Sequence, residues 1–405
     1  MFGRAGRGEI ASSTAVGLQP RSLTGGFRSW HAPAARRAAA DVATRPIPSL
    51  QVLRALAALA VIYTHIRYDF SVKFAIVDFP PHIGLLDIGV DMFFVISGFV
   101  MVYASERLFQ RRGGPREFLA RRILRIVPLY WATSLAALAY ILVRQRASDL
   151  VPSAVFYTWA AASFLFLPYA RTNGELSPLN GVGWTLNYEM LFYAVFAMAV
   201  CVSRRGAVAA IALLFAAMVL VGLRYGPLPN PFAFWCDPLI LELVFGMLIA
   251  VALREGWRLP PWLAHGVILA GLAVFLLTEH FAPATSRVLA WGLPSALVVA
   301  GLTLKAGSRD VRHPGRHPGR HPGLLARTFG FLGAASYAIY LVHPFALAAP
   351  RLLHFGLAGD GITPPAQPWL YASLQLVAAV AAGAIVHVGV ERPVTRALRR
   401  ARESR

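Results

Sequence analysis

Two ionisable residues, Arg54 and His65, lie inside an otherwise apolar stretch at residues 50–70. About twenty apolar residues are the length that crosses a bilayer as one helix. The two residues are eleven positions apart, which is roughly three helical turns, so both side chains would lie on one helix face. A charge that faces lipid is costly, and this face therefore predicts a polar cavity inside a helix bundle. We expect His65 to transfer protons there and Arg54 to help hold a phosphorylated donor.

Four further ionisable residues fall at about the depth of His65 when each predicted helix is measured at roughly 1.5 Å per residue. They are Asp91 in GVDMFFVISGF, Glu189 in WTLNYEMLFY, Glu242 and His343. A carboxylate beside a histidine orients the ring and stabilises its charged form, so we predict that Asp91 or Glu189 does this for His65. For Glu242 and His343, a structural hydrogen bond is as good an explanation as a functional role. In the case of His343, the proline that follows would free a backbone carbonyl group to which the ring could bond.

A second group of residues is basic and contains Arg122 and Arg125 of REFLARRILRIVPLYW. They are three residues apart and are therefore neighbours on one helix face at the membrane entry. Together with Arg54 they could bind the phosphates of a donor. The alternative is that they only anchor the helix, as basic residues at the flank of a span commonly do.

No pattern in the sequence predicts a metal site. The two cysteines, Cys201 and Cys236, fall on different predicted helices, which disfavours a disulfide and leaves no metal-binding spacing. A repeat of His, Pro, Gly and Arg occupies residues 313–323 of a loop at 306–326. Histidine-rich tracts can bind metal, but proline and glycine in every unit favour a flexible linker.

Composition indicates the class of protein. The 405 residues are 57% hydrophobic and 14% charged, whereas a soluble domain carries about 25% charged residues. We predict an all-α polytopic membrane helix bundle with about ten transmembrane helices and one short re-entrant or interfacial helix. The ten spans are expected near residues 50–68, 86–105, 125–143, 185–203, 207–223, 236–253, 262–279, 287–304, 329–350 and 370–390. The short helix is expected at 154–170, where an eleventh span is the alternative.

The distribution of basic residues predicts the topology. Thirty of the 39 lysine and arginine residues fall in segments that ten spans would place on the same side as both termini. Such a bias marks the cytosolic side of a membrane, and it argues against nucleic acid as the partner of a chain with a net charge of +20. We divide the chain into a disordered basic cytosolic tail at 1–46, a transmembrane domain at 47–395 and a basic cytosolic tail at 396–405.

Six motifs, taken in order, resemble those of the acyltransferase 3 family. They are the first span with Arg54 and His65, then GVDMFFVISGF, FLARRILRIVPLYW, WTLNYEMLFY, SYAIYLVHP and the closing ERP at residues 391–393. The match covers about residues 50–395. Within the family, LQVLRALAALAV and WTLNYEM are similar to the branch that acetylates exopolysaccharides.

The resemblance implies an integral membrane O-acyltransferase of the bacterial plasma membrane. It would take acetyl groups from cytosolic acetyl-CoA, without a metal, and pass them to a carbohydrate acceptor, with polysaccharide assembly machinery as a further partner. The first-helix arginine and histidine of the family fall on Arg54 and His65, and its paired arginines fall on Arg122 and Arg125. The sequence departs from the family at Gln51, where an aspartate is common.

Two other classes of protein would also place polar residues inside a helix bundle. A transporter that exports a glycan or an acylated lipid would do so, although the two halves of the sequence show no internal repeat. A structural subunit of a polysaccharide assembly complex is the other alternative, and it would tolerate neutralisation of the buried charges.

Overall fold

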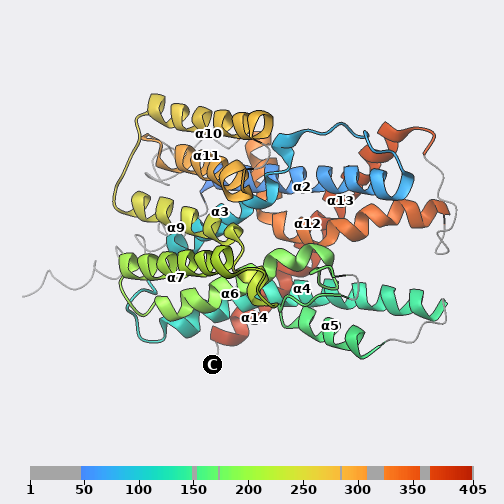
Figure 1. Cartoon of the computed structure of the whole chain (residues 1–405), viewed down its shortest axis with the longest axis horizontal. Coiled ribbons are helices and arrows are strands. Elements are labelled where there is room, and N and C mark those ends of the chain that lie inside the picture. Colours follow the sequence, from blue (N-terminus) through green and yellow to red (C-terminus); the bar gives the residue numbers. More distant parts are fainter. Residues whose placement is uncertain are drawn as a thin grey trace, which may run out of the picture. The chain divides into compact units, whose positions relative to one another are not determined.

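The computed structural model describes residues 47–147, 153–171, 174–282, 285–307, 323–355 and 365–403. Within these ranges the regular structure is helical, apart from one isolated bridge between Leu259 and Lys305 (Figure 1). The prediction of an all-α fold is therefore confirmed. The predicted tail at 1–46 and most of the predicted loop at 306–326 lie outside the described residues.

Each of the ten predicted spans contains a helix. In chain order the helices are α2 (Pro48–Phe74), α3 (Gly89–Ala104), α4 (Gly114–Ala147), α5 (Ala154–Phe164), α6 (Trp184–Ala199), α7 (Arg204–Tyr225), α8 (Phe232–Trp235), α9 (Leu241–Arg254), α10 (Pro261–Phe281), α11 (Leu293–Leu304), α12 (Leu324–Phe355), α13 (Pro368–Val386) and α14 (Arg392–Glu403). Short 3₁₀ turns, η1 (Gly84–Leu86), η2 (Gly181–Gly183) and η3 (Pro238–Ile240), come before α3, α6 and α9. Turns of π-helix, η4 (Val288–Gly292) and η5 (His387–Glu391), come before α11 and α14.

Seven helical segments of the described chain are long and apolar enough to cross a membrane, so the chain is a polytopic membrane protein. The other three predicted spans are shorter than expected, because α6 and α9 have only 16 and 14 residues and α11 has 12. Turns of 3₁₀ or π-helix occupy the chain just before each of them. Helix α5 has 11 residues, fewer than the roughly twenty of a straight span, as predicted for the short helix at 154–170. The basic segment that follows residue 395 is helical as far as Glu403.

Helix α2 is packed between two apolar cores. Pro48 suits its first turn, because the N–H that proline lacks would be unpaired there. Leu53 and Val61 belong to a core shared with α3, α6 and α9, and Ile62 and Ile66 belong to a second core shared with α12 and α13. Both flanks of α2 are therefore covered by other helices, as a helix with ionisable side chains requires.

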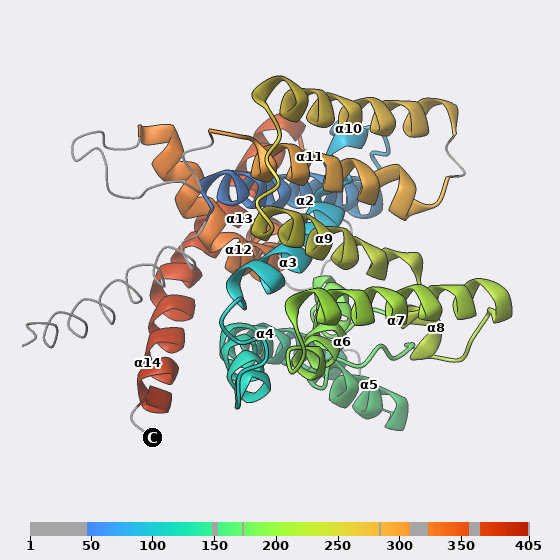
Figure 2. The same ribbon diagram turned by 90° about the vertical axis from the view of Figure 1, so that its left-hand side faces the viewer.

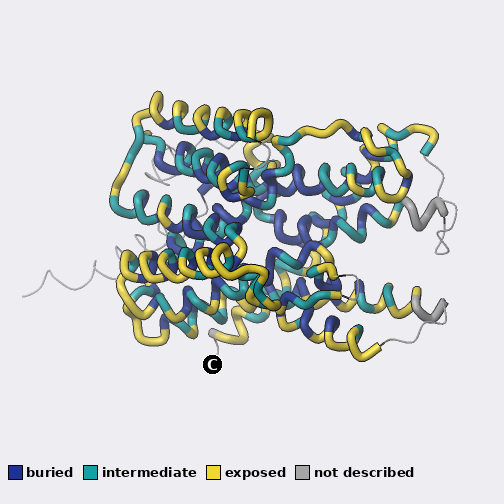
Figure 3. Tube along the Cα trace, viewed as in Figure 1, coloured by how far each residue is buried: buried dark blue, intermediate teal, exposed yellow. Residues whose placement is uncertain are grey.

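Helices α7 and α10 lie at the outside of the described bundle. Figures 1 and 2 show α10 on the far side of α11 from α9, and Figure 3 shows that α7 and α10 are exposed along most of their length. Their exposed side chains include Leu213 and Leu220 of α7 and Leu269 and Leu276 of α10. Large apolar side chains exposed on this scale are typical of helices that face lipid.

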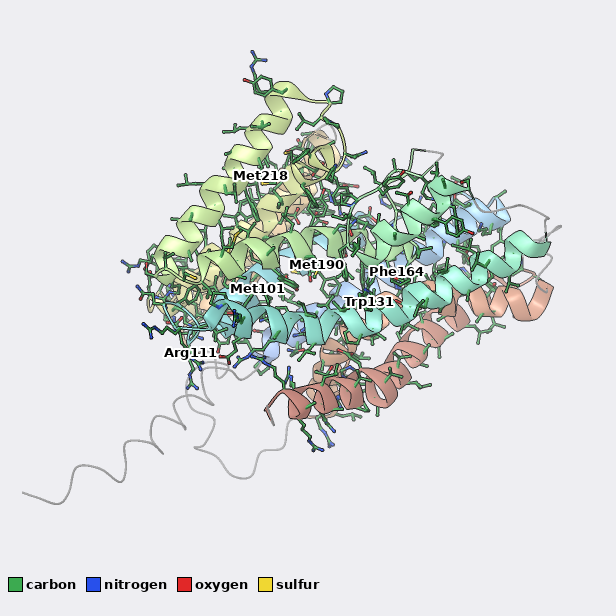
Figure 4. All side chains as sticks on the ribbon, turned by 90° about the horizontal axis from the view of Figure 1, so that it is seen from below. Met101, Arg111, Trp131, Phe164, Met190 and Met218 are labelled. Atoms are coloured by element: carbon green, nitrogen blue, oxygen red, sulfur yellow. The ribbon has the colours of Figure 1, made fainter. Side chains whose placement is uncertain are left out.

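Helix α5 is held against α4 by two hydrogen bonds to backbone carbonyl groups. The indole Nε1 of Trp131 donates to the carbonyl of Phe164 at 3.0 Å, and the Tyr130 hydroxyl donates to the carbonyl of Ser163 at 2.9 Å (Figure 4). These carbonyls lie in the last turn of α5, where intrahelical partners run out. The two side chains therefore fix the end of a helix that is too short to be stable alone.

Two glycines bring α3 and α9 into backbone contact. A Cβ atom at Gly98 would lie 2.0 Å from the Leu243 carbonyl oxygen, and one at Gly246 would lie 1.9 Å from the Val95 carbonyl oxygen. Both distances are far below van der Waals contact, so only glycine fits at either position. Small residues allow membrane helices to approach this closely.

We expect Gly246→Ala to lower the thermal stability of the purified protein. The added methyl group would push α3 and α9 apart, and overpacking of this kind costs about 1–3 kcal/mol or more. Thermal unfolding in detergent, followed by tryptophan fluorescence, measures the effect. Gly266→Ala in α10 is the control, because a Cβ atom there meets nothing within 4 Å. Equal unfolding temperatures for the two variants would contradict the assigned contact.

Candidate active site

A cavity of about 100 Å³ lies among α2, α3, α4, α6 and α12. The polar and charged side chains that line it are Arg54, Ser97, Arg122, Arg125, Thr185, Glu189, Tyr193, Ser336, Tyr337 and Tyr340. The structure thus brings together all three arginines that the sequence singled out as donor-binding residues. They come from two helices, α2 and α4, that are separated by the 39 residues from 75 to 113.

The three guanidinium groups have few partners among the residues that the structure describes. Arg54 donates to the Ser336 hydroxyl at 2.9 Å. Arg122 lies over the ring of Phe118, 5.6 Å from its centroid, and its buried Nε has no hydrogen-bond partner in the described part of the chain. Arg125 faces the same cavity. Guanidinium groups arranged in this way can bind an anion such as a phosphate.

Arg121, the residue next to Arg122 on α4, differs from the cavity arginines in its surroundings. Arg121 is exposed and forms an ion pair with Glu117 on the surface of the same helix. Arg122 and Arg125 are partly buried and line the cavity, and neither forms an ion pair with another described residue. Helix anchoring explains Arg121 fully, but it leaves the inward-facing pair without a role.

Glu189 lies in this cavity and not beside His65. Its Oε2 accepts a hydrogen bond of 2.5 Å from the Tyr193 hydroxyl, one turn further along α6. The prediction that Glu189 shares a layer with His65 and orients its ring is therefore wrong. Glu189 lies near the start of α6, as expected, but α4 begins at Gly114 and not near residue 125, so that Arg122 and Arg125 are well inside α4 and line the same cavity as Glu189.

His65 is oriented by the backbone of its own helix. Its Nδ1 lies 2.8 Å from the Val61 carbonyl oxygen, and because a carbonyl can only accept, Nδ1 carries the hydrogen. The lone pair of the neutral ring is then on Nε2, where a general base needs it. Its ring meets that of His343 edge to face, with 4.8 Å between the centroids. In the described part of the chain no carboxylate bonds to either ring.

Asp91 belongs to a different cluster. It is fully buried, and its two carboxylate oxygens accept hydrogen bonds of 2.9 and 3.0 Å from Arg287. Glu242 is buried beside it, packed against Gly292 so closely that a Cβ atom there would lie 2.6 Å from the carboxylate. The described residues thus show no bond between Asp91 and His65: Asp91 pairs with Arg287, and the His65 ring bonds to the backbone of its own helix.

We expect Arg287→Ala to destabilise the protein by about 3–5 kcal/mol, since it would leave the Asp91 carboxylate buried without its partner. Retention of the folded protein during heating in detergent measures this loss. Arg205→Ala is the control, because the side chain of Arg205 is 75% exposed where it pairs with Glu255 and such surface pairs contribute about 0–1 kcal/mol. A small effect at Arg287 would show that the pair with Asp91 does not support the fold.

Three site residues were missed by sequence reasoning. Arg287 resembled an ordinary basic residue at the flank of a span, although it lies at the start of η4 and reaches Asp91. Tyr193 could have been found, because it is four residues after Glu189 and so lies on the same helix face. Ser336 carries no signal beyond its place in SYAIYLVHP. No described group of three or more His, Cys, Asp and Glu residues could hold a metal ion.

Comparison with known proteins identifies relatives that match most of the chain. An acyltransferase domain, that of the acyltransferase 3 family, matches residues 47–388. The exopolysaccharide production protein ExoZ of Rhizobium meliloti is 33% identical over 76% of this chain and 89% of its own length. The acyltransferase MdmB of Streptomyces mycarofaciens is 28% identical over 88% of this chain and 93% of its own. YrhL of Bacillus subtilis, a candidate peptidoglycan O-acetyltransferase, is 27% identical over 74% of this chain and 48% of its own. No solved structure matches the chain at a significant level.

Proposed function

The chain belongs to the acyltransferase 3 family and is a membrane O-acyltransferase, and from this premise we propose that it transfers an acetyl group from acetyl-CoA to a sugar hydroxyl. The acceptor would be a surface polysaccharide or exopolysaccharide, or its lipid-linked precursor. One relative is named for exopolysaccharide production and another for O-acetylation of peptidoglycan, which supports both the acetyl group and the glycan. The observation that carries the proposal is the cavity with three inward-facing guanidinium groups.

Arg54, Arg122 and Arg125 would hold the phosphate groups of acetyl-CoA. They come from two helices and converge on one cavity, as recognition of a compact polyanion requires. Acetyl-CoA supplies an activated thioester on a long, flexible arm. Because His65 is eleven residues beyond Arg54 on the same helix, roughly 16 Å along its axis, such an arm suits the separation between the phosphate site and the base.

His65 would act as the general base. Its Nε2 would take the proton of the sugar hydroxyl while the hydroxyl oxygen attacks the thioester carbonyl carbon. A C–O bond forms, the C–S bond breaks, and the same proton passes from Nε2 to the departing sulfur. The Nδ1 bond to the Val61 carbonyl holds the ring in the required tautomer throughout. Transfer through a transient acetyl-histidine would use the same atoms. Neither Glu189 nor Asp91 would contact the His65 ring. Glu189 lines the arginine cavity, and Asp91 pairs with Arg287.

The proposed setting is the plasma membrane of a bacterium, with both termini in the cytosol. The arginine cluster would then open toward the cytosol, where acetyl-CoA is made, and His65 would lie nearer the opposite face, where a polysaccharide grows. This orientation follows from the bias of basic residues toward the segments on the side of the termini. Polysaccharide assembly machinery is the partner that such a reaction would serve.

The test is acetylation by the purified protein in lipid nanodiscs, supplied with labelled acetyl-CoA and the polysaccharide of the host cell. We expect labelled O-acetyl ester on the glycan, and loss of the corresponding signals from the NMR spectrum of the cell-surface polysaccharide when the gene is deleted. A glycan that stays unlabelled in vitro while its export fails in the deletion strain would favour a transporter and would contradict the proposal.

A further inference from the structure

His343 is a second imidazole at the proposed base, and it comes from a different helix. Helices α2 and α12 meet at two polar contacts, between Arg54 and Ser336 and between His65 and His343. The earlier residue of α2 meets the earlier residue of α12, and the later meets the later, so the two helices run parallel. The contact between Arg54 and Ser336 lies in the cavity, and the contact between His65 and His343 lies at the proposed base.

One nitrogen of His343 has a structural role. Pro344 lies in the middle of α12 and has no N–H, so the carbonyl group four residues earlier, that of Tyr340, loses its helical partner. The Nδ1 of His343 lies 2.8 Å from this carbonyl oxygen and therefore donates to it. The backbone bond also fixes which side of the ring carries the lone pair, namely Nε2.

The other nitrogen has no structural role. His343 is completely buried, and its Nε2 has no hydrogen-bond partner among the described residues. Buried acceptors in native proteins are nearly always satisfied, and an exception requires an explanation. The ring of His65 is 4.8 Å away between centroids, nearer than the ring of Tyr340 at 6.0 Å. Among the described residues, no carboxylate forms a hydrogen bond or an ion pair with either histidine.

We propose that His343 is a positioning residue that stabilises His65 in its protonated form, and thus takes the place of the carboxylate in a histidine–carboxylate pair. This inference rests on the proposed function. The neutral ring, with its hydrogen fixed on Nδ1, has the negative end of its dipole on the Nε2 side. A positive charge on the adjacent ring of His65 is stabilised by such a fixed dipole, and the effect is strong where water is excluded.

Two substitutions of His343 separate its proposed effect on His65 from its bond to the Tyr340 carbonyl. In His343→Asn the amide nitrogen can replace Nδ1 and still donate to the Tyr340 carbonyl, but nothing replaces Nε2. In His343→Gln the longer side chain places its amide near the position of Nε2 and gives up the bond to Tyr340. If His343 serves only to bond the Tyr340 carbonyl that Pro344 leaves without a partner, the asparagine variant is active and the glutamine variant is impaired.

We expect the opposite for acyl transfer. The asparagine variant should unfold near the wild-type temperature and keep its KM for acetyl-CoA, while kcat falls about 10- to 100-fold, the effect of one interaction with a charged group. The glutamine variant should unfold at a lower temperature yet transfer faster than the asparagine variant, per folded molecule. An asparagine variant with wild-type kcat would overturn the inference and leave the proposed function intact. A wild-type protein that transfers no acyl group would overturn both.

Discussion

Replacing His65 by alanine should reduce acyl transfer about 10²- to 10⁴-fold, the usual contribution of a general base, and should leave the affinity for acetyl-CoA nearly unchanged. The substitution removes Nε2, the atom that would accept the hydroxyl proton, while the arginine cavity lies elsewhere along α2. Initial rates of transfer in nanodiscs and equilibrium binding of labelled donor measure the two quantities separately.

His280→Ala is the matched control for this substitution. His280 is an exposed histidine in the last turn of α10, so its loss should alter neither rate nor binding. Transfer at the wild-type rate by the His65 variant would refute the role of this residue as the base. A fall in donor affinity equal to the fall in rate would instead assign the ring to donor binding.

The double substitution of Arg122 and Arg125 by alanine should weaken binding of acetyl-CoA by about 10²- to 10⁴-fold. Each guanidinium would lose a hydrogen-bonded interaction with phosphate, and interactions with charged groups contribute about 1.5–3 kcal/mol each. Binding of labelled donor to purified protein gives the dissociation constant directly. At saturating donor the remaining transfer should be closer to normal, because His65 is untouched.

The control for this pair comes from the same helix. Arg116 and Arg121 are exposed on α4, and replacing both by alanine removes the same amount of charge without reaching the cavity. Comparable losses from the two double variants would mean that net charge, and not the inward-facing arginines, attracts the donor. A loss confined to Arg122 and Arg125 would separate phosphate binding from helix anchoring.

The sequence was sufficient for the helices but not for the contacts between them. The lengths of the apolar runs predicted a helix at each of ten places, because bilayer thickness fixes how many apolar residues a span needs. The spacing of Arg122 and Arg125 also predicted that they share a helix face. Both inferences depend on positions along a single helix, where geometry is regular.

Partners across helices could not be inferred in the same way. Depth measured from expected helix ends placed Asp91 and Glu189 beside His65, but Glu189 bonds to Tyr193 of its own helix and lines the arginine cavity. Arg287 takes both oxygens of Asp91, and no local pattern marks that pair. Tertiary packing decides which polar groups of equal depth meet, and one sequence contains little information about it.

The imbalance of charge in the cavity has a further consequence. Three guanidinium groups line the cavity together with one carboxylate, that of Glu189, so between turnovers the site would attract counter-ions such as chloride or inorganic phosphate. Acetyl-CoA would have to displace them, and rising ionic strength would slow its loading, because mobile ions screen exposed charges over about 8 Å at physiological salt. The ionic composition of the compartment that the cavity faces would therefore affect the acetyl-CoA concentration at which the enzyme reaches half its maximal rate.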